Sequence, residues 1–416
     1  MARRTLSIIP YYGGKQRMAR FIADMLNYDD SDIYIEPFGG ACRVLLNKPR
    51  HEYEIYNDYG VGVTALMKVM SDPEDARELI YRLYETEYSQ EQFDKAKEIY
   101  DNAELDLLDD TGGRLIKELK KLLVDYRFIK KNISHKDFMT VLRNVSHIKD
   151  LGNKIKGETS QKRKAIWAEI KRLSTTYNTI RDAVEEQGYV MRGRDLDQSI
   201  NPVDMDMELA IATYIVFKQS RDAMGQSWSR GRMSTDQYRN QIPRLFECAE
   251  RMEGVSVLNI DAMAFFKKYA LEKNTNEIDN SNPSYMTILE WINNPRVMMY
   301  CDPSYIRIED EEELLKDIDL AKEDNISQKI RELHGDKMPR NLGKLYAMSF
   351  SYADQEDFIK GIYDAKCKVM ISNYDLKLYN KYLTPENGWR RIEVESSTSV
   401  GSKVDNRRIE VLWYNY

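Results

Sequence analysis

Short β-prone runs that end in glycine or acidic residues, each followed by a helix-prone stretch, constrain the fold of this 416-residue chain most strongly. Ile33-Tyr34-Ile35 leads into Glu36-Pro37-Phe38-Gly39-Gly40, a helix is expected over 41–46, and a second run, Glu54-Ile55-Tyr56, ends at Asn57-Asp58. This alternation has the spacing of βαβ units, which build parallel sheets covered by helices. Further strands are expected over 255–258, 297–301, 368–371 and 409–413.

The region between the early and the late strands has a different composition. Residues 73–186 are rich in Lys, Glu, Leu and Tyr, and leucines recur at helical spacing at Leu115, Leu119, Leu122 and Leu123. The simplest architecture is one α/β domain made from residues 1–70 and 250–416, interrupted by a mostly helical insertion over residues 71–249.

Charge is distributed unevenly along this chain, whose formal net charge is −6. Residues 113–173 contain 17 Lys and Arg against 6 Asp and Glu, whereas residues 307–337 contain 6 basic and 11 acidic residues. Such asymmetry points to a polyanion partner. Solvated helix faces would explain the same counts, so this feature alone leaves both interpretations open.

Several classes of protein are disfavoured. No window approaches the roughly 18 apolar residues of a membrane span, and the apolar run at the start is too short for a secretory signal. We therefore expect a cytoplasmic protein without a membrane partner. The four cysteines and four histidines are scattered without ligand spacing, so neither a disulfide framework nor a metal site is expected. Chemistry must come from carboxylates, amides and backbone groups.

The loop Glu36-Pro37-Phe38-Gly39-Gly40 after the first strand is a candidate ligand-binding turn. Glycines at the end of a strand let the backbone approach a ligand, and the start of the next helix presents free N–H groups. About 20 residues later the second strand ends at Asp58, where nucleotide-binding folds place an acid that accepts hydrogen bonds from ribose hydroxyls. The pair favours a nucleoside cofactor, although an ordinary turn at Gly39-Gly40 and a helix cap at Asp58 stay open.

A second glycine pair lies near the amino terminus, in Pro10-Tyr11-Tyr12-Gly13-Gly14-Lys15. Two glycines followed by a lysine can hold a carboxylate or a phosphate, with Lys15 as a point charge and a tyrosine beside it to stack on a ring. The GxxxxGK[ST] spacing of a P-loop is absent, so a nucleotide triphosphatase is disfavoured. A simple entry turn before an amphipathic helix over residues 16–26 explains these residues equally well.

The most informative run is Tyr300-Cys301-Asp302-Pro303-Ser304-Tyr305, at the carboxyl end of the strand expected over 297–301. Ligands of open α/β sheets bind outside the carboxyl ends of the strands, so this loop and the loop at Glu36 can face one crevice. The run brings together an acid, a rigid proline and an aromatic ring. A β-turn with a capping Asp302 is the alternative.

This run resembles the (D/N/S)-P-P-(Y/F) motif of amino-group methyltransferases that use S-adenosylmethionine. Four companions occur in the order seen in the Dam-like (D12 class) DNA adenine N6-methyltransferases: residues 10–15, 34–40, 57–58 and 369–375. The resemblance covers roughly residues 8–68 and 255–416, while the helical insertion is similar only in its position. It implies a Rossmann-like S-adenosylmethionine methyltransferase domain, α/β in class, with a large, mostly helical inserted domain.

The resemblance assigns residues of this chain to the cofactor, S-adenosylmethionine. Asp58 would hold its ribose hydroxyls, and Asp261 would contact its adenine unless it is a helix N-cap. Asn373 would help to shape the target-base pocket unless it forms an Asx turn. Asp302 would border the cofactor as well as the substrate. The methionine end would contact Tyr11, Gly13, Gly14 and Lys15, and the main cradle would be Glu36, Pro37, Phe38, Gly39 and Gly40.

Asp302, Pro303, Ser304 and Tyr305 would form the catalytic loop. The Asp302 carboxylate and the Pro303 carbonyl would each accept a hydrogen bond from the adenine amine, which favours a pyramidal nitrogen with its lone pair facing the sulfonium methyl. Tyr305 would stack on an adenine flipped out of duplex DNA. Two residues depart from the family pattern: Cys42 replaces the glycine that often closes the cofactor loop, and Ser304 replaces the second proline.

DNA contacts are expected in the insertion. The run from Lys218 to Arg230 mixes amides, arginines and Trp228, the residue types that read base edges, and it lies where the family carries its recognition hairpin. Lys218, Arg221 and Arg230 are the candidate DNA-binding residues, with solvated surface charges as the alternative.

The resemblance therefore implies a site-specific adenine N6-methyltransferase of double-stranded DNA that needs no metal, with a restriction endonuclease as a candidate partner. Transfer to cytosine N4 or to a protein glutamine stays open, because those acceptors would use the same Asp-Pro loop. A DNA-binding protein of the same fold that has lost catalysis also stays open, because Cys42 and Ser304 depart from the pattern.

Overall fold

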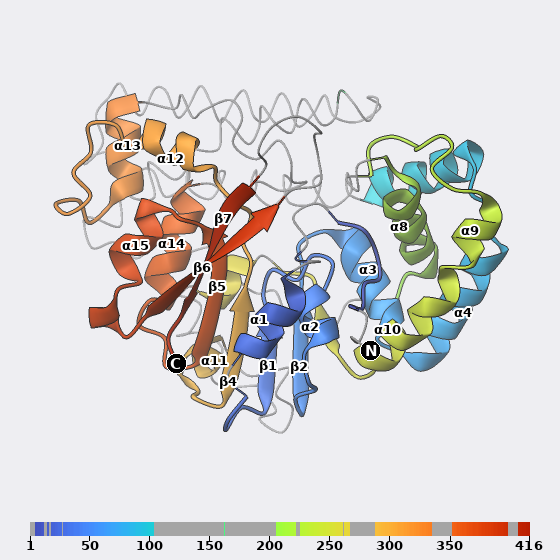
Figure 1. Cartoon of the computed structure of the whole chain (residues 1–416), viewed down its shortest axis with the longest axis horizontal. Coiled ribbons are helices and arrows are strands. Elements are labelled where there is room, and N and C mark those ends of the chain that lie inside the picture. Colours follow the sequence, from blue (N-terminus) through green and yellow to red (C-terminus); the bar gives the residue numbers. More distant parts are fainter. Residues whose placement is uncertain are drawn as a thin grey trace, which may run out of the picture. The chain divides into compact units, whose positions relative to one another are not determined.

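The computed structural model describes residues 5–11, 15, 18–26, 28–103, 162, 205–221, 225–260, 262–266, 288–334, 352–397 and 407–416. Contacts divide the chain into two compact units, one formed by residues 1–97 and 200–416 and the other by residues 98–199. All seven strands of the described sheet lie in the first unit (Figure 1).

The sheet has the strand order β3-β2-β1-β4-β5-β7-β6. Strands β1 to β5 pair in parallel, whereas β7 lies antiparallel to both β5 and β6. Every strand expected from the sequence is present, and β6 is an additional edge strand. The strands are β1 (Ile33–Glu36), β2 (Tyr53–Asn57), β3 (Ser256–Leu258), β4 (Val297–Cys301), β5 (Lys368–Tyr374), β6 (Arg390–Ser397) and β7 (Arg407–Tyr414).

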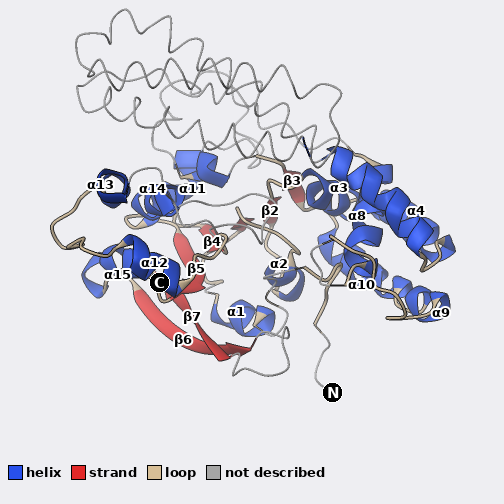
Figure 2. Cartoon of the chain, turned by 90° about the horizontal axis from the view of Figure 1, so that it is seen from above, coloured by secondary structure: helices blue, strands red, loops and turns tan. Residues whose placement is uncertain are grey.

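Helices cover both faces of the parallel strands. Figure 2 shows α1 (Ala19–Met25) and α2 (Arg43–Asn47) on one side of the sheet and α11 (Ile288–Asn293) and α14 (Tyr352–Ile362) on the other. All residues of β1 and β4 are buried, which is why residues 33–35 and 297–301 read as unbroken runs of apolar and aromatic residues rather than as an alternating pattern; Glu36 is the charged residue that ends β1.

The strand order reverses between β1 and β4. From β1 the chain continues to β2 and β3 on one side, and it later returns to build β4 and β5 on the other. Ile33 pairs with Val297 and Ile35 with Met299, so Glu36 and Asp302 follow at the carboxyl ends of neighbouring strands. Ligands of open α/β sheets bind at such a reversal. The expectation that the two loops share one edge of the sheet is therefore confirmed.

A group of helices packs beside β3 and belongs to the same unit as the sheet. Asp72 caps α4 by accepting the backbone N–H groups of Glu74 and Asp75. The sequence placed these helices in an insertion over residues 71–249, and that domain division stays a prediction, since residues 104–161 and 163–204 lie outside the described part of the chain. The group consists of α3 (Val61–Met70), α4 (Pro73–Glu85), α8 (Met207–Gln219), α9 (Thr235–Arg239), η1 (Ile242–Arg244) and α10 (Leu245–Met252).

The acidic run Glu309–Glu313 lies in α12 (Ile308–Leu314) and has a structural partner. Glu311 is buried and accepts the backbone N–H groups of Lys377 and Leu378 at 2.7 and 3.0 Å, which caps the start of α15 (Lys377–Tyr382). The remaining described elements are η2 (Ala262–Phe265), α13 (Ile326–His334) and η5 (Pro385–Asn387). Among the described residues, none of the helices combines the length and apolar character that crossing a bilayer requires.

Candidate active site

Asp302 directly follows β4, and its side chain is 18% exposed. Its Oδ1 atom accepts a hydrogen bond from Ser372 Oγ on β5 at 2.8 Å and lies 2.9 Å from Lys15 Nζ. Burial raises the pKa of this carboxyl, although Lys15 and Ser372 oppose the shift. Both contacts reach the same oxygen, so among the described residues Oδ2 keeps its lone pairs for a substrate.

Lys15 brings the amino-terminal segment onto the tip of β4. Its Nζ lies 3.5 Å from Glu410 Oε2 and 4.4 Å from the centre of the Tyr305 ring, in addition to its ion pair with Asp302. Burial by itself would lower the pKa of Lys15, but the two carboxylates raise it above its usual value. The ammonium therefore stays charged beside the catalytic motif. Sequence reasoning placed Lys15 only at the methionine end of the cofactor.

Tyr11 is the other described residue of the set predicted to contact the methionine end of the cofactor. Tyr11 packs its ring against Phe217 at 5.3 Å, and it lies over Gly40. Gly13 and Gly14 lie outside the described residues, so their predicted contact with the cofactor stays a prediction.

The rest of the Asp-Pro loop is held by side chains from β5, β7 and the helices beside them. Pro303 is buried, and the Tyr305 hydroxyl donates to Glu410 Oε2 at 3.1 Å while its ring meets Tyr374 edge-on at 4.8 Å. The Ser304 carbonyl accepts a hydrogen bond from Gln355 Nε2 at 2.7 Å. These contacts fix the loop even though Ser304 replaces a proline.

Asn373 supports this loop indirectly. Its Nδ2 donates to the Tyr379 hydroxyl at 3.1 Å, and that hydroxyl donates in turn to Gln355 Oε1. Its Oδ1 accepts the N–H of Tyr374 at 2.8 Å. The buried Asn373 amide is thus engaged with protein groups on both sides, which agrees with a local structural role; its part in the target-base pocket stays a prediction.

Glu36 ends β1 and is almost completely buried, with 2% of its surface exposed. It accepts a hydrogen bond from the Tyr34 hydroxyl at 2.7 Å, and burial raises its pKa to about 7. The next residue, Pro37, is buried, and Phe38 packs against Phe266 and Phe358 at 6.0 and 5.6 Å between ring centres.

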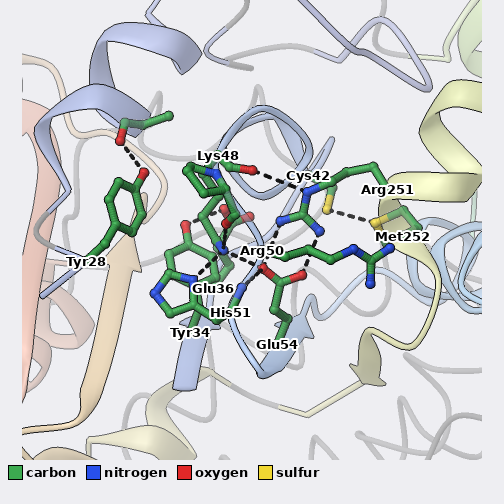
Figure 3. A network of polar contacts seen from close by, with 12 residues as sticks. Tyr28, Tyr34, Glu36, Cys42, Lys48, Arg50, His51, Glu54, Arg251 and Met252 are labelled. Carbon is green, nitrogen blue, oxygen red and sulfur yellow. Dashed lines mark hydrogen bonds and ion pairs between the residues drawn. The ribbon is translucent and has the colours of Figure 1, made fainter. Parts of the chain in front are cut away.

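A buried network lies behind Glu36 (Figure 3). Lys48 Nζ lies 3.9 Å above the Tyr34 ring and bonds to the carboxylate of Glu54, which Arg251 of α10 holds with two N–H groups at 2.6 and 2.8 Å. Burial lowers the pKa of Lys48 to about 8. His51 Nδ1 lies 2.8 Å from Lys48 Nζ, and burial together with that cation lowers the pKa of His51 to about 4. The sequence analysis missed this network, because its members are spread over four elements.

The glycine loop has little steric freedom. A Cβ atom on Gly39 would lie 2.7 Å from Cζ of the buried Tyr56 ring, and Gly40 has a φ of +48°, a value that side-chain-bearing residues rarely adopt. Cys42 also has a positive φ of 58° and is fully buried. The position where the family often has glycine therefore keeps a glycine-like backbone, and α2 begins only after it.

Asp58 supports the glycine loop from β2. Its Oδ2 accepts the N–H of Gly40 and its Oδ1 accepts the N–H of Gly60, both at 2.8 Å. Each carboxylate oxygen has a second lone pair, so these bonds leave acceptor capacity for ribose hydroxyls. The turn-and-cap interpretation of Asp58 is present in the structure, and its cofactor role stays a prediction. Asp261 lies outside the described residues.

The residues at the strand ends fit a cationic nucleoside. Burial raises the pKa of Glu36, of Asp58 and of Asp302, which means that each carboxylate lacks full solvation. A sulfonium and an ammonium on one ligand, as in S-adenosylmethionine, would compensate such charges. Within the described ranges, His, Cys, Asp and Glu side chains form no group of three suited to a metal ion.

The candidate DNA-binding residues border a short antiparallel hairpin. Ser220 forms a β-bridge with Trp228, and the N–H of Arg221 donates to the Ser227 carbonyl at 2.9 Å. Arg221 and Arg230 are exposed, while Lys218 is half-buried in α8. A hairpin at this place agrees with the expectation from the sequence, but DNA contact by the three cations is not tested by this structure.

Three residues that contact the catalytic loop were missed at the level of sequence: Gln355, which donates to the Ser304 carbonyl, Ser372 and Glu410. Ser372 lies inside the run 369–375 that carried the resemblance, and Glu410 is an acid within the hydrophobic strand Ile409-Glu410-Val411-Leu412-Trp413. An acid within an otherwise apolar run is the signal that would have identified Glu410.

Comparison with known families agrees with this geometry. Residues 11–187 match the model of the D12 class N6 adenine-specific DNA methyltransferases, a range that includes Lys15, the Glu36 loop and Asp58 and ends before Asp302. A comparison with curated proteins gave no match. Residues 11–187 thus match a D12 class N6 adenine-specific DNA methyltransferase domain, the family of enzymes that methylate adenine N6 in DNA and depend on S-adenosylmethionine.

Proposed function

We propose that this enzyme recognises a specific DNA sequence and methylates a flipped adenine at the edge of the sheet where β1 and β4 end. The observation that carries the proposal is the position of Asp302: it directly follows β4, the neighbour of the strand that Glu36 ends, and no described residue contacts its Oδ2. The catalytic loop at Asp302 and the cofactor loop at Glu36 can then hold the target adenine and the cofactor next to each other. S-adenosylmethionine supplies a methyl group on a sulfonium centre, activated for transfer.

Three groups would hold the cofactor. Glu36 offers a buried carboxylate to its positive charges, Gly39 and Gly40 let the backbone approach it, and Asp58 offers its remaining lone pairs to the ribose. The Phe38 ring, packed on Phe266 and Phe358, gives this side of the crevice an apolar wall. Gly13, Gly14, Tyr11 and Asp261 complete the proposed set.

Asp302 and Pro303 would activate the adenine amine, a poor nucleophile because its lone pair is delocalised into the ring. The Oδ2 atom of Asp302 and the carbonyl of Pro303 each accept one N–H, which favours a pyramidal nitrogen. The same oxygens stabilise the positive charge that develops on that nitrogen during transfer. The surplus proton leaves after transfer, so a histidine base is not required.

Tyr305 would stack on the flipped adenine. Extrusion of the base costs a few kcal/mol, and stacking on an aromatic ring recovers roughly 1–3 kcal/mol. The Glu410 contact and the edge-on Tyr374 ring hold Tyr305 in place, which reduces the entropy that stacking would otherwise cost.

Sequence recognition would fall to the hairpin that contains Ser220 and Trp228, with Lys218, Arg221 and Arg230 as its cations. The basic stretch over residues 113–173 would add phosphate contacts, so the affinity for DNA should fall steeply with salt. The cytoplasmic location and the restriction endonuclease partner likewise stay predictions of the sequence.

The test is methylation in a host that lacks DNA methylation. Expression of the wild-type chain, followed by nucleoside mass analysis and long-read sequencing, should show N6-methyladenine within one DNA word. Asp302→Ala should abolish the signal. The control is Asp319→Ala, which removes an exposed acid that follows the Asp-Pro loop in the sequence and should leave the signal unchanged. Methylated cytosine instead of adenine, or substantial turnover by Asp302→Ala, would refute the proposal.

A further inference from the structure

Glu410 is the one residue of β7 whose described contacts reach two members of the catalytic site. It lies 105 residues beyond Tyr305 in the chain, and its side chain is 14% exposed. Its Oε2 atom accepts the Tyr305 hydroxyl at 3.1 Å and lies 3.5 Å from Lys15 Nζ. The family resemblance assigns no role to Glu410, and the matched range over residues 11–187 does not include it.

Glu410 contacts two side chains of the proposed catalytic site, Lys15 and Tyr305. Lys15 lies between the carboxylates of Asp302 and Glu410, and it reaches Asp302 at Oδ1 rather than Oδ2. Tyr305 is anchored at its hydroxyl, so its ring presents a fixed plane. Removal of the Glu410 carboxylate would take one anionic contact away from Lys15 and would remove the acceptor that the Tyr305 hydroxyl has among the described residues.

Register explains why β7 can supply this carboxylate. Glu410 pairs with Tyr374 of β5, and Ser372 lies two residues earlier on β5, where it donates to Asp302. The Tyr374 ring meets Tyr305 edge-on. Strands β5 and β7 therefore form one wall of the catalytic loop, and Glu410 is the charged group of that wall.

We propose that Glu410 is a positioning residue for methyl transfer, which holds Lys15 on Oδ1 of Asp302 and fixes the Tyr305 ring, so that Oδ2 is directed at the target amine. This inference rests on the proposed function of Asp302 and Tyr305. Glu410 itself does not touch the reacting atoms.

The first test is the rate of a single turnover with Glu410→Gln at saturating S-adenosylmethionine and DNA. Glutamine keeps an oxygen that can accept the Tyr305 hydroxyl, but it removes the negative charge that Glu410 presents to Lys15. The rate should fall about 10- to 100-fold, as expected when reacting groups are misplaced, while the affinity for S-adenosylmethionine stays within about twofold. Glu395→Gln is the matched control, because it removes the same charge from an exposed position on the adjacent strand β6.

The second readout is the pH profile of that rate, which a merely structural role would not move. The groups that interact with Asp302 come from several elements: Lys15 from the amino-terminal segment, Glu36 from β1, Ser372 from β5 and Glu410 from β7. Tyr300 and Tyr305 belong to its own strand and loop. Because the charge of Glu410 raises the pKa of Asp302, its removal should shift the acid limb of the profile to lower pH. Tyr305→Phe should lower the rate and leave that limb nearer to the wild-type position.

A wild-type rate and pH profile in Glu410→Gln would overturn the inference while leaving the proposed function intact. A loss of rate that is matched by loss of thermal stability and cofactor affinity, with an unmoved pH profile, would also overturn it, since Glu410 would then only stabilise the fold. Absence of adenine methylation by the wild-type chain would instead refute the proposed function.

Discussion

The substitution Gly39→Ala tests whether the loop after β1 is the cofactor cradle. A Cβ atom at this position would lie 2.5 Å from Cδ2 and 2.7 Å from Cζ of Tyr56, so the ring must move. Tyr56 is fully buried, and its hydroxyl donates to the Gly40 carbonyl at 2.7 Å. The displacement therefore strains the core and breaks a hydrogen bond to the loop.

The size of the effect follows from these contacts. Overpacking a core costs about 1–3 kcal/mol, and a buried hydrogen bond contributes about 0.5–1.5 kcal/mol. If the whole loss of about 1.5–4.5 kcal/mol falls on the bound conformation of the loop, it would weaken S-adenosylmethionine binding roughly 10- to 1,600-fold, at about 1.4 kcal/mol for each factor of ten. Isothermal titration calorimetry measures the affinity, and thermal unfolding measures how much of the cost falls on folding.

Two further variants separate a local clash from general damage. In Gly39→Ala/Tyr56→Leu the smaller side chain makes room for the new Cβ, so part of the lost affinity should return. Gly388→Ala introduces a Cβ into open space at a φ of +83°, so it should reduce stability modestly and leave cofactor affinity unchanged. Wild-type affinity and stability in Gly39→Ala would refute the reasoning.

Three other predictions follow from the buried acids and the catalytic loop. The affinity of the wild type for S-adenosylmethionine should fall about tenfold from pH 8 to pH 6, because Glu36, whose pKa is raised to about 7, loses its charge over this range. Glu36→Gln should bind the cofactor more weakly and without this pH dependence; an unchanged pH dependence in the variant would contradict the role of Glu36 in cofactor binding. Glu54→Ala should reduce the free energy of unfolding by about 3–5 kcal/mol, because Lys48 and Arg251 lose the carboxylate that balances their charges in the interior. Glu208→Ala, which breaks an exposed ion pair, should cost under about 1 kcal/mol, and equal losses of the two variants in urea titrations would refute the difference between the buried and the exposed pair. Ser304→Pro should keep the methylation rate within about threefold, because the contact recorded for Ser304 among the described residues uses its carbonyl, which proline retains; a severe loss of rate would show that the Ser304 N–H is needed.

The strands and their loops could be predicted from the sequence because the signal is local. A buried parallel strand is a short apolar run, and a glycine or an acid at its end marks the loop. For this reason β1 to β5, β7 and the position of Glu36 and Asp302 at one edge of the sheet could be predicted. The start of α2 was expected at residue 41 but lies at Arg43, because Cys42 adopts a left-handed backbone conformation that apolar periodicity does not reveal.

The contacts that position the catalytic loop could not be predicted in the same way. Lys15 and Asp302 are far apart in the chain, and nothing in either neighbourhood indicates that they form an ion pair. Glu54 looked like an ordinary polar position of a strand, and its partners Lys48 and Arg251 become apparent only in the folded chain, where the Arg251 side chain of α10 reaches β2. Side-chain networks of this kind depend on three-dimensional packing rather than on sequence spacing.

The position of β4 between β1 and β5 has a consequence for biosynthesis. Strand β1 (residues 33–36) pairs with β4 (residues 297–301) in the finished sheet. At translation rates of about 5–20 residues per second, the ribosome needs roughly 13–50 s after it has made β1 to reach β4. During that interval one side of the nascent βαβ unit exposes unpaired backbone groups on a strand with no charged residue except Glu36, a surface open to unwanted association. Newly made chains therefore depend on chaperone protection, or on delayed collapse, until the fourth strand arrives.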